Sequence, residues 1–282
     1  VVPPRGPEER LMTLKASGGE ELQVLVLAST ILGSPGLERL LQSLPWPVHA
    51  IGVGAVDVWE ALSSDIEAAL SSFRAEQNVL ITDAYDVVLM PCNRSILEEF
   101  RRLGAGIVVS AEKGCWRGGE QSRCPSCESR YPEGSERRSA CNAGFPNLNA
   151  GGIIGSAAAL SEAFAWMKTN VVAAYGDAQG WWWRYYEEFP SRVALDYSQR
   201  IWSTLYQCDG QAFRVTDVDG RCGVVVSDYV GGEACFLHGN SNGRVILDRL
   251  ASESARACGR SDVGLERRML GAEPEKAQPG RG

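Results

Sequence analysis

Residues 78–90 read NVLITDAYDVVLM, and this stretch decides the class of fold. Its apolar run at 79–81 ends abruptly at Asp83 and Asp86, and a second apolar run follows at 87–90. Short apolar runs rich in Val and Ile are typical of buried strands. Carboxylates at the end of a buried strand are costly unless a partner such as a divalent cation compensates their charge. Asp83 and Asp86 are therefore candidate metal ligands, with ordinary turn residues after a strand as the alternative.

Further apolar runs on either side of this stretch predict buried strands at residues 21–29, 48–53, 106–110 and 193–196. Segments with helical spacing of apolar residues predict helices at residues 35–44, 56–73, 96–103 and 157–167. Strands that alternate with helices imply an α/β fold, in which a mostly parallel sheet carries helices on both faces. The last ordered segments are expected at residues 201–206, 222–226 and 235–238.

Length and composition bound the class of protein. The chain has 282 residues, of which 44% are hydrophobic and 22% charged, as in an ordinary soluble globular protein. Its net charge of −7 argues against a protein that mainly binds nucleic acid or an anionic membrane, and no apolar run approaches the length of a membrane span. We expect one domain over residues 21–258, between a flexible arm at 1–20 and a flexible tail at 259–282.

Nine cysteines are many for an intracellular enzyme and favour an oxidising compartment, either the lumen of the secretory pathway or the outside of the cell. Cys115, Cys124, Cys127 and Cys141 lie in the irregular stretch 112–147. The CPSC motif has the spacing of zinc ligands, but the total cysteine count favours disulfides over a four-thiolate zinc site. The odd count leaves at least one thiol unpaired if all the others form intramolecular bridges.

Two further segments carry candidate chemistry. Residues 148–156, LNAGGIIGS, predict a glycine-rich turn before a helix, at which a ligand can approach the backbone closely. They match neither the P-loop nor the dinucleotide fingerprint. Residues 177–183, DAQGWWW, are either part of an amphipathic helix with aromatic anchors or a polar catalytic edge beside a sugar-stacking surface.

Six segments together resemble the glycosyltransferase domain of procollagen lysyl hydroxylases and related procollagen glycosyltransferases. They occur in the family's order over residues 22–250: TDAYDVVL at 82–89, AEKGCW at 111–116, LNAGGIIGS at 148–156, the Asp177/Gln179 segment, LDYSQRIWSTLY at 195–206 and LHGNSNGR at 237–244. The resemblance implies a GT-A-like (Rossmann-like) fold with a mixed, mostly parallel sheet flanked by helices and a cysteine-rich loop insertion. It also implies manganese, UDP-glucose or UDP-galactose as donor, and a hydroxylysine, collagen-like or glycan acceptor.

The resemblance assigns roles to individual residues. Asp83, Asp86 and His238 correspond to the ligands of Mn²⁺, an ion that mixed oxygen and imidazole ligation suits. Asp177 and Gln179 take the catalytic positions. The donor pocket corresponds to Trp59, Thr82, Trp116, Asn149, Gly151 and Gly152. Among these, Trp59 resembles a tryptophan near the uridine base, and the glycines allow close approach of the sugar to the backbone.

Two departures from the family pattern bear on activity. Ala178 stands where the family usually has a second acidic residue before the glutamine, and residues 61–65 lack the family's lysine. A missing carboxylate or cation weakens catalysis or donor binding. The Ala178 departure keeps open one alternative, a catalytically weak relative that binds a nucleotide sugar or a collagen-like partner. The cysteines keep open another, a cysteine-rich zinc module in an unrelated α/β protein.

Overall fold

The computed structural model describes residues 12–15, 22–28, 35–51, 58–116, 124–171, 177–229 and 231–259. Side chains are described for these residues except 12–15, 58–63 and 143. Apart from Met12–Lys15 and Gly259, the expected flexible arm and tail lie outside the described residues. No described helix is long and apolar enough to cross a membrane.

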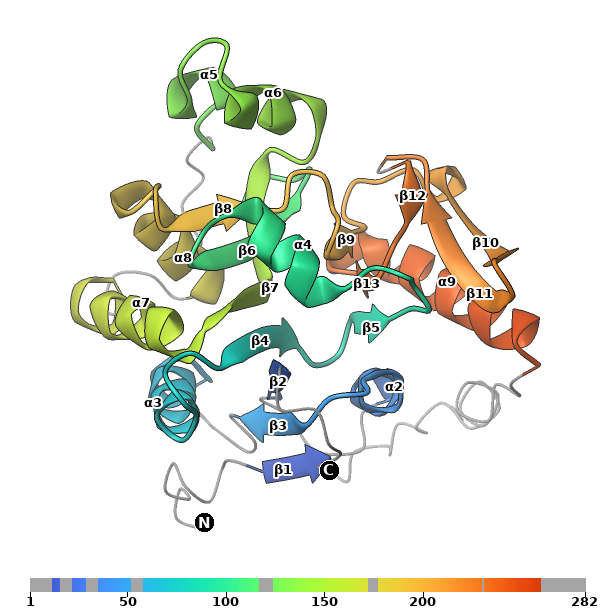
Figure 1. The fold of residues 1–282 in the computed structure, drawn as a ribbon, viewed down its shortest axis with the longest axis horizontal. Coiled ribbons are helices and arrows are strands. Elements are labelled where there is room, and N and C mark those ends of the chain that lie inside the picture. Colours follow the sequence, from blue (N-terminus) through green and yellow to red (C-terminus); the bar gives the residue numbers. More distant parts are fainter. Residues whose placement is uncertain are drawn as a thin grey trace, which may run out of the picture.

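The centre of the molecule is a seven-stranded mixed sheet with the strand order β1-β3-β2-β4-β7-β6-β8 (Figure 1). Five of its strands run in one direction, and β1 and β7 run against them. The strands are β1 (Met12–Lys15), β2 (Leu22–Leu27), β3 (Val48–Ile51), β4 (Asn78–Asp83), β6 (Ile107–Glu112), β7 (Asn147–Ser156) and β8 (Val193–Leu195). The predicted mixed, mostly parallel sheet is therefore confirmed.

Both faces of this sheet are covered, because side chains along each strand alternate between two cores. Leu25, Val79 and Ile81 face a core built with α3 (Val58–Ser71), α7 (Ala157–Asn170) and α8 (Ala178–Glu188). Val24, Val26 and Leu80 face the other core, built with α2 (Pro35–Ser43) and α4 (Ile96–Leu103). Ser95 begins α4 by accepting a hydrogen bond from Glu98 N, and Gly104 ends it in the left-handed conformation.

Two small sheets and a terminal helix complete the fold (Figure 1). One sheet has the order β5-β13-β9, with β5 (Val87–Leu89), β9 (Trp202–Thr204) and β13 (Phe236–His238). The other consists of β10 (Phe213–Val218), β11 (Arg221–Ser227) and β12 (Gly232–Glu233). Leu247 and Leu250 of α9 (Arg244–Ala257) pack into a third core between these sheets.

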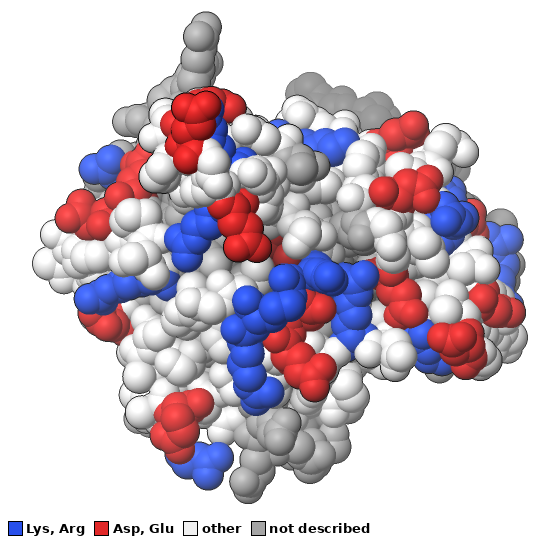
Figure 2. All heavy atoms as spheres, turned by 45° about the horizontal axis from the view of Figure 1, so that its top comes forward, with Lys and Arg blue, Asp and Glu red and all other residues white. Residues whose placement is uncertain are grey.

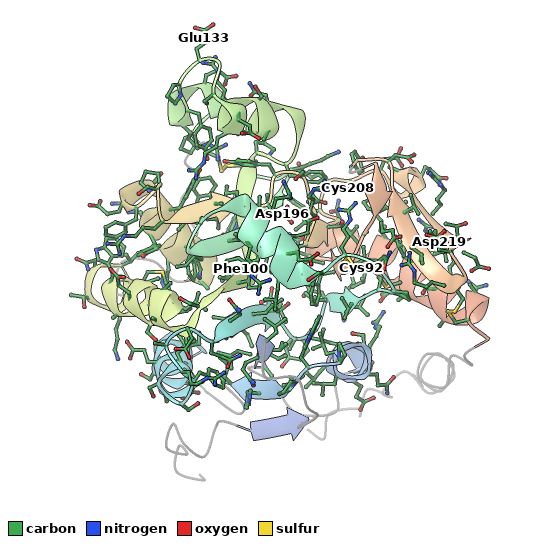
Figure 3. The ribbon with its side chains drawn as sticks, viewed as in Figure 1. Cys92, Phe100, Glu133, Asp196, Cys208 and Asp219 are labelled. Atoms are coloured by element: carbon green, nitrogen blue, oxygen red, sulfur yellow. A yellow bond between two sulfur atoms is a disulfide. The ribbon has the colours of Figure 1, made fainter. Side chains whose placement is uncertain are left out.

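Eight of the nine cysteines form disulfides, and Cys208 is free. Cys115–Cys124 and Cys127–Cys141 hold the predicted irregular stretch, which contains the short helices α5 (Cys127–Arg130) and α6 (Glu136–Ala143). Cys92–Cys235 and Cys222–Cys258 lie elsewhere. We call residues 124–146 the cysteine-rich lobe; it projects from the sheet, with Glu133 at its tip (Figure 3). The prediction of disulfides in place of a zinc site is confirmed.

Three predictions about local structure are wrong. Residues 147–156 are the ten-residue central strand β7, not a glycine-rich turn, and their glycines make room for neighbouring side chains. Met12–Lys15 pairs with β3 as an edge strand and so is not part of a loose arm. The ordered chain continues beyond residue 238 into the 14-residue helix α9.

The surface carries charges of both signs. Figure 2 shows basic and acidic side chains interspersed over the face that it displays. Glu99, for example, lies 2.7 Å from Nε of Arg102 and 3.7 Å from Nε of Arg200. Exposed pairs of this kind contribute little to stability, because water and salt screen them.

Candidate functional site

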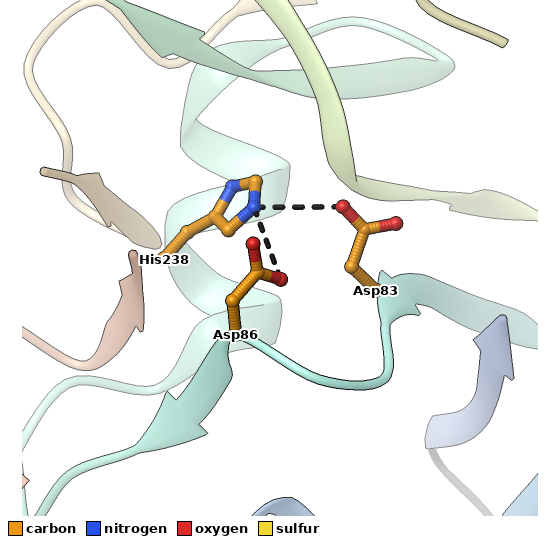
Figure 4. A group of neighbouring side chains, drawn as sticks. All are labelled: Asp83, Asp86 and His238. Atoms are coloured by element: carbon orange, nitrogen blue, oxygen red, sulfur yellow. Dashed lines mark ion pairs between the residues drawn. The ribbon is translucent and has the colours of Figure 1, made fainter. Parts of the chain in front are cut away.

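Three metal-ligating side chains meet where β4, β5 and β13 come together. Asp83 is the last residue of β4, Asp86 directly precedes β5, and His238 is the last residue of β13. The antiparallel pairing of β13 with β5 sets His238 opposite Val87, and Gly239 N donates to Asp86 O at 2.7 Å. Nε2 of His238 lies 3.5 Å from Oδ2 of Asp83 and 3.5 Å from Oδ1 of Asp86 (Figure 4).

The orientation of the His238 ring is fixed from behind by Asn149 in β7. Nδ1 of His238 lies 3.0 Å from Oδ1 of Asn149, and the same oxygen accepts a hydrogen bond from Gly151 N at 3.0 Å. Because a backbone N–H only donates, the atom at this position must be the amide oxygen, and Nδ1 must carry the proton. Nε2 is therefore the nitrogen that faces the two carboxylates.

The charges of the cluster shift its pKa values. Burial lowers the pKa of His238, but the carboxylates of Asp86 and Asp83 outweigh it and raise the pKa to about 10. Burial raises the pKa of Asp86, but the charges of His238 and Arg244 and a hydrogen bond to His238 hold it below its ordinary value. The Asp86 carboxylate thus lies beside the His238 cation, and a divalent ion can take the place of that cation.

The cluster fits a divalent metal ion. The ligand atoms of Asp83, Asp86 and His238 all lie within 4.8 Å of one another. Nε2 of His238 is buried, and the only groups that the described residues set opposite it are the carboxylates of Asp83 and Asp86 at 3.5 Å. A Cβ on Gly151 would lie only 2.1 Å from Cε1 of His238 and 2.7 Å from Oδ2 of Asp83, so only glycine leaves this space free. Two carboxylates with one imidazole suit manganese and similar divalent ions.

The cluster forms part of the wall of a cavity of about 760 Å³. The cavity lies beyond the end of β4, at the sheet edge where ligands bind in open α/β sheets. Carboxylate, amide and basic groups share its wall with one exposed aromatic ring. The lining residues outside the cluster include Tyr85, Glu112, Trp116, Asn149, Gly151, Asp177, Ala178, Gln179, Tyr206, Asn240 and Arg244.

Asp177 and Trp116 are joined across the cavity wall. Trp116 is 54% exposed, and its Nε1 donates to Oδ2 of Asp177 at 3.0 Å. The other oxygen of Asp177, Oδ1, accepts from Gly180 N at 2.8 Å and caps helix α8. The capping bond fixes the carboxylate at the start of the helix, where the helix dipole favours its charge.

Gln179 is held by several hydrogen bonds and links three segments. Its Oε1 accepts from Ala150 N at 2.7 Å, and its Nε2 lies 2.6 Å from Leu148 O and 3.1 Å from Oε1 of Glu112. The side-chain amide of Gln179 therefore both accepts from and donates to the backbone of β7, as a neighbouring strand would. This geometry makes Gln179 a residue that positions β7 and Glu112.

The other predicted residues fall into three groups. Asn149 and Gly151 line the cavity. Thr82 is fully buried and donates to Gly151 O at 3.2 Å, and a Cβ on Gly152 would lie 2.4 Å from Nε1 of Trp202, so both face the protein interior. The side chain of Trp59 lies outside the described part of the chain.

The tryptophans of the DAQGWWW segment do not offer a sugar-stacking surface. Trp181, Trp182 and Trp183 are each 1% exposed, and they anchor α8 in the core. The interpretation of this segment as an amphipathic helix with aromatic anchors is confirmed, and the sugar-stacking interpretation of its rings is wrong. Asp177 is the charged residue of this segment that lines the cavity.

Two charged residues of the cavity, Glu112 and Arg244, were not predicted from the sequence. Burial raises the pKa of Glu112, although Asn240 donates to its Oε2 at 2.8 Å. Glu112 is the last residue of β6, as Asp83 is of β4, and this position at the end of a buried strand was the signal available. Arg244 ends the LHGNSNGR segment and begins α9, and its charge acts on Asp86.

Comparisons with known proteins find a relative by sequence. A procollagen-lysine,2-oxoglutarate 5-dioxygenase of Drosophila melanogaster is 25% identical over 197 residues, which cover 68% of this chain. The match spans only 25% of that relative's length.

Solved structures with similarity to the chain have low TM-scores. Apo mouse xyloside xylosyltransferase 1 has a TM-score of 0.43 at 12% identity, covering 80% of this chain and 99% of its own. The protein A197 from STIV has a TM-score of 0.37 at 10% identity, covering 76% and 93%. The 2-C-methyl-D-erythritol 4-phosphate cytidylyltransferase of Francisella tularensis has a TM-score of 0.34 at 11% identity, covering 62% and 90%.

The family described as PLOD GT domain matches residues 64–259, which include Asp83, Asp86, Asp177 and His238. This range covers more than half of the chain and most of the cavity wall. The chain therefore belongs to the PLOD GT domain family and contains a PLOD-like glycosyltransferase domain.

Proposed function

We propose that the chain transfers a hexose from UDP-glucose or UDP-galactose to a hydroxyl group of a protein or glycan acceptor, with hydroxylysine in collagen-like sequence as the first candidate. The single observation that carries this proposal is the cluster of Asp83, Asp86 and His238 in the wall of a cavity large enough for a ligand. The family of the chain supports the reaction class.

The metal end of the cavity suits the diphosphate of the donor. Asp83, Asp86 and His238 would hold Mn²⁺, which when bound would neutralise the charge that develops on the diphosphate as its bond to the sugar breaks. Arg244 lines the same end and would pair with phosphate oxygens through its fixed positive charge. Arg244 thereby offers a positive charge for the diphosphate, although residues 61–65 lack the lysine that the family tends to have.

The part of the wall formed by Trp116, Asp177 and Gln179 suits the sugar and the acceptor. The acceptor oxygen forms a bond to the anomeric carbon, the bond from that carbon to the diphosphate breaks, and UDP leaves with the bonding electrons. We assign the acceptor's hydroxyl proton to the carboxylate of Asp177, which lines the cavity. Gln179 acts as a positioning residue through its contacts with β7 and Glu112, and Trp116 and Asn149 would contact the donor.

The four disulfides are typical of a protein that folds in an oxidising compartment. We propose that the chain works in the secretory-pathway lumen or outside the cell, where disulfides persist and hydroxylated protein acceptors are available. Localisation of a tagged full-length protein by microscopy and fractionation tests this part of the proposal. Recovery of the protein mainly in the cytosol, with its cysteines reduced, contradicts it.

A transfer assay tests the proposed reaction. The purified chain is incubated with a hydroxylysine peptide and UDP-glucose, UDP-galactose or UDP-N-acetylglucosamine, with Mn²⁺ or with EDTA. We expect a mass increase of one hexose on the peptide together with release of UDP, and neither in EDTA. UDP binding without any transfer or donor hydrolysis supports a catalytically weak relative that only binds the donor. Failure to bind UDP with Mn²⁺ contradicts the proposal.

Ala178 is the observation that favours the second candidate, a catalytically weak relative that binds the donor without efficient turnover. Its methyl group lines the cavity next to Asp177, where the family usually presents a second carboxylate. Ala178→Asp restores that group in the first turn of α8, where the helix dipole favours an acid. A clear gain in transfer by this variant supports a weakened site, whereas unchanged or lower transfer contradicts it.

A further inference from the structure

Residues 93–95 read NRS and lie outside the candidate donor site. An asparagine that is followed two positions later by serine or threonine, with any residue except proline between them, is an acceptor for asparagine-linked glycosylation. Among the eight asparagines of the chain, Asn93 is the only one that satisfies this pattern. The pattern has meaning where the fold presents the asparagine at its surface and the chain passes through the secretory pathway.

Asn93 lies at the surface of an irregular loop. Residues 90–95 connect β5 to α4 without forming helix or strand, and Asn93 and Ser95 are both exposed. The side-chain amide of Asn93 makes no hydrogen bond to any residue that the structure describes. An oligosaccharide attached to this amide would therefore extend into solvent without displacing a contact of the described fold.

The backbone of this loop is held in place although the Asn93 side chain is exposed. The backbone N–H of Asn93 donates to Oε2 of Glu233 at 2.6 Å, and a disulfide joins the preceding residue, Cys92, to Cys235. On the other side, Oγ of Ser95 caps helix α4. These contacts fix where the Asn93 amide stands on the surface, and none of them uses the amide itself.

The loop leads away from the metal cluster. Strand β5 begins directly after Asp86, which lines the donor cavity, and the chain continues beside the segment that precedes β13. Met90 N donates to Cys235 O, and Asn93 N then reaches Glu233, so each step moves further from Asp86 along that segment. Residues 90–95 are all described, and none of them lines the cavity. An oligosaccharide on Asn93 therefore leaves the donor site open.

The order of the cysteines keeps Asn93 accessible while the chain is being made. Cys235 follows Cys92 by 143 residues, so the disulfide next to Asn93 forms only after most of the domain has been synthesised. The four disulfides are themselves typical of the compartment in which asparagine-linked glycosylation takes place. Sequence pattern, exposure and compartment thus agree at this one residue.

We infer that Asn93 is a glycosylation site and carries an asparagine-linked oligosaccharide. This inference rests on the proposed secretory location of the chain and is independent of the reaction proposed for its donor cavity. The co-reactant is a lipid-linked oligosaccharyl diphosphate, used by the oligosaccharyltransferase of the host cell. Nδ2 of Asn93 forms a bond to the anomeric carbon and loses one proton. The bond from that carbon to the diphosphate breaks, and the lipid diphosphate leaves with the bonding electrons.

The wild-type chain and three variants test the site, each directed into the secretory pathway of a cultured eukaryotic cell by an attached leader peptide. Asn93→Gln removes the asparagine that the pattern requires. Ser95→Asp removes the hydroxyl group of the pattern but keeps a capping residue for α4, because aspartate and serine cap helices about equally well. Ser95→Thr is the matched control, since threonine keeps both the pattern and the cap.

Wild type and Ser95→Thr should migrate more slowly in a denaturing gel than the same proteins treated with peptide N-glycosidase. The glycosidase should convert residue 93 to aspartate, which peptide mass spectrometry detects. Asn93→Gln and Ser95→Asp should show no shift. Wild-type protein recovered with its disulfides formed but with Asn93 unmodified contradicts the inference, and so does a glycosidase-sensitive shift that persists in Asn93→Gln.

The leader peptide supplies the location, so an unmodified Asn93 counts against the glycosylation site and not against the proposed compartment. Binding of UDP with Mn²⁺ is measured on the same preparations. Asn93→Gln should bind UDP as the wild type does, because the loop does not line the donor cavity. Loss of UDP binding in every form would instead show a failure of the proposed donor site.

Discussion

The side-chain oxygen of Asn149 lies 3.0 Å from Nδ1 of His238 and holds the imidazole with Nε2 toward Asp83 and Asp86. These residues come from three different strands, β7, β13 and β4, and from the turn before β5. The site therefore depends on the pairing of the central sheet with the small β5-β13-β9 sheet.

Replacing Asn149 with Ala should weaken Mn²⁺ binding by about 10- to 100-fold, because the ring of His238 loses the bond that sets its proton and its orientation. The change should also cost about 1–3 kcal/mol of unfolding free energy, since Gly151 N loses its partner. Calorimetric titration with Mn²⁺ and urea unfolding measure the two effects. Asn93→Ala, at an exposed position, is the control. Wild-type Mn²⁺ affinity in Asn149→Ala would contradict the assignment of Asn149 as the residue that orients His238 for the metal.

Mn²⁺ binding near pH 7 should release about one proton, because the metal replaces the proton on Nε2 of His238. The pKa of His238 is raised from 6.5 to about 10 in the folded protein, so protonation stabilises the metal-free fold. That contribution is complete below pH 6.5 and is lost as the pH rises through about 10. Affinity for Mn²⁺ should therefore increase with pH in this window.

Calorimetry in buffers of different ionisation enthalpy measures the released proton directly. The apparent binding enthalpy should change linearly with the ionisation enthalpy of the buffer. A binding enthalpy that is the same in every buffer would show that His238 is neutral before the metal binds or does not bind it.

Gly151→Ala should abolish Mn²⁺ binding, because the added Cβ would lie 2.1 Å from Cε1 of His238. Gly106→Ala is a matched control, since its Cβ would meet no atom closer than 3.9 Å. Metal titration and thermal melting of both variants separate a blocked site from a damaged fold. A Gly151→Ala protein that keeps wild-type Mn²⁺ affinity would mean that this space is not part of the site.

Removing the Cys127–Cys141 disulfide with paired serine substitutions should lower the unfolding free energy by about 3 kcal/mol, because the crosslink restricts a loop of about 15 residues in the unfolded chain. Cys208→Ser is the control, since Cys208 has no disulfide partner. Denaturant unfolding gives both values. A doubly substituted protein as stable as Cys208→Ser would show that the lobe is held by its packing alone.

The sequence predicted the parts of the fold that depend on local pattern. The apolar runs that form β2, β3, β4 and β6 are buried on both faces of the sheet. A continuous apolar run identifies such a strand from the local sequence alone. Asp83 and Asp86 were singled out as candidate ligands because charges at the end of a buried strand stand out, and the structure brings them together with His238. The helix α4 was predicted with its observed bounds, since its apolar face and its final glycine are both local signals.

The parts that were missed depend on contacts between distant segments. The glycines of β7 suggested a turn. In the fold, a Cβ on Gly151 would clash with His238 and a Cβ on Gly152 would clash with Trp202, and both of these side chains are distant in sequence. The strand β10 is largely exposed and so lacks a strong apolar alternation. His238 was assigned through the family resemblance alone, because a single histidine at the end of a short strand carries no local signal for metal binding.

The most direct test of the central claim is calorimetric titration of the wild-type chain with UDP in Mn²⁺ and in EDTA, repeated with Asp83→Asn and Asp86→Asn. The account predicts UDP binding that requires Mn²⁺ in the wild type and falls at least about 100-fold in each variant, with melting temperatures little changed, because each substitution removes a charged ligand of the ion. Glu128→Gln, which alters a fully exposed carboxylate of the lobe, should leave binding unchanged. UDP binding of equal strength in EDTA, or retained in both aspartate variants, would contradict the account.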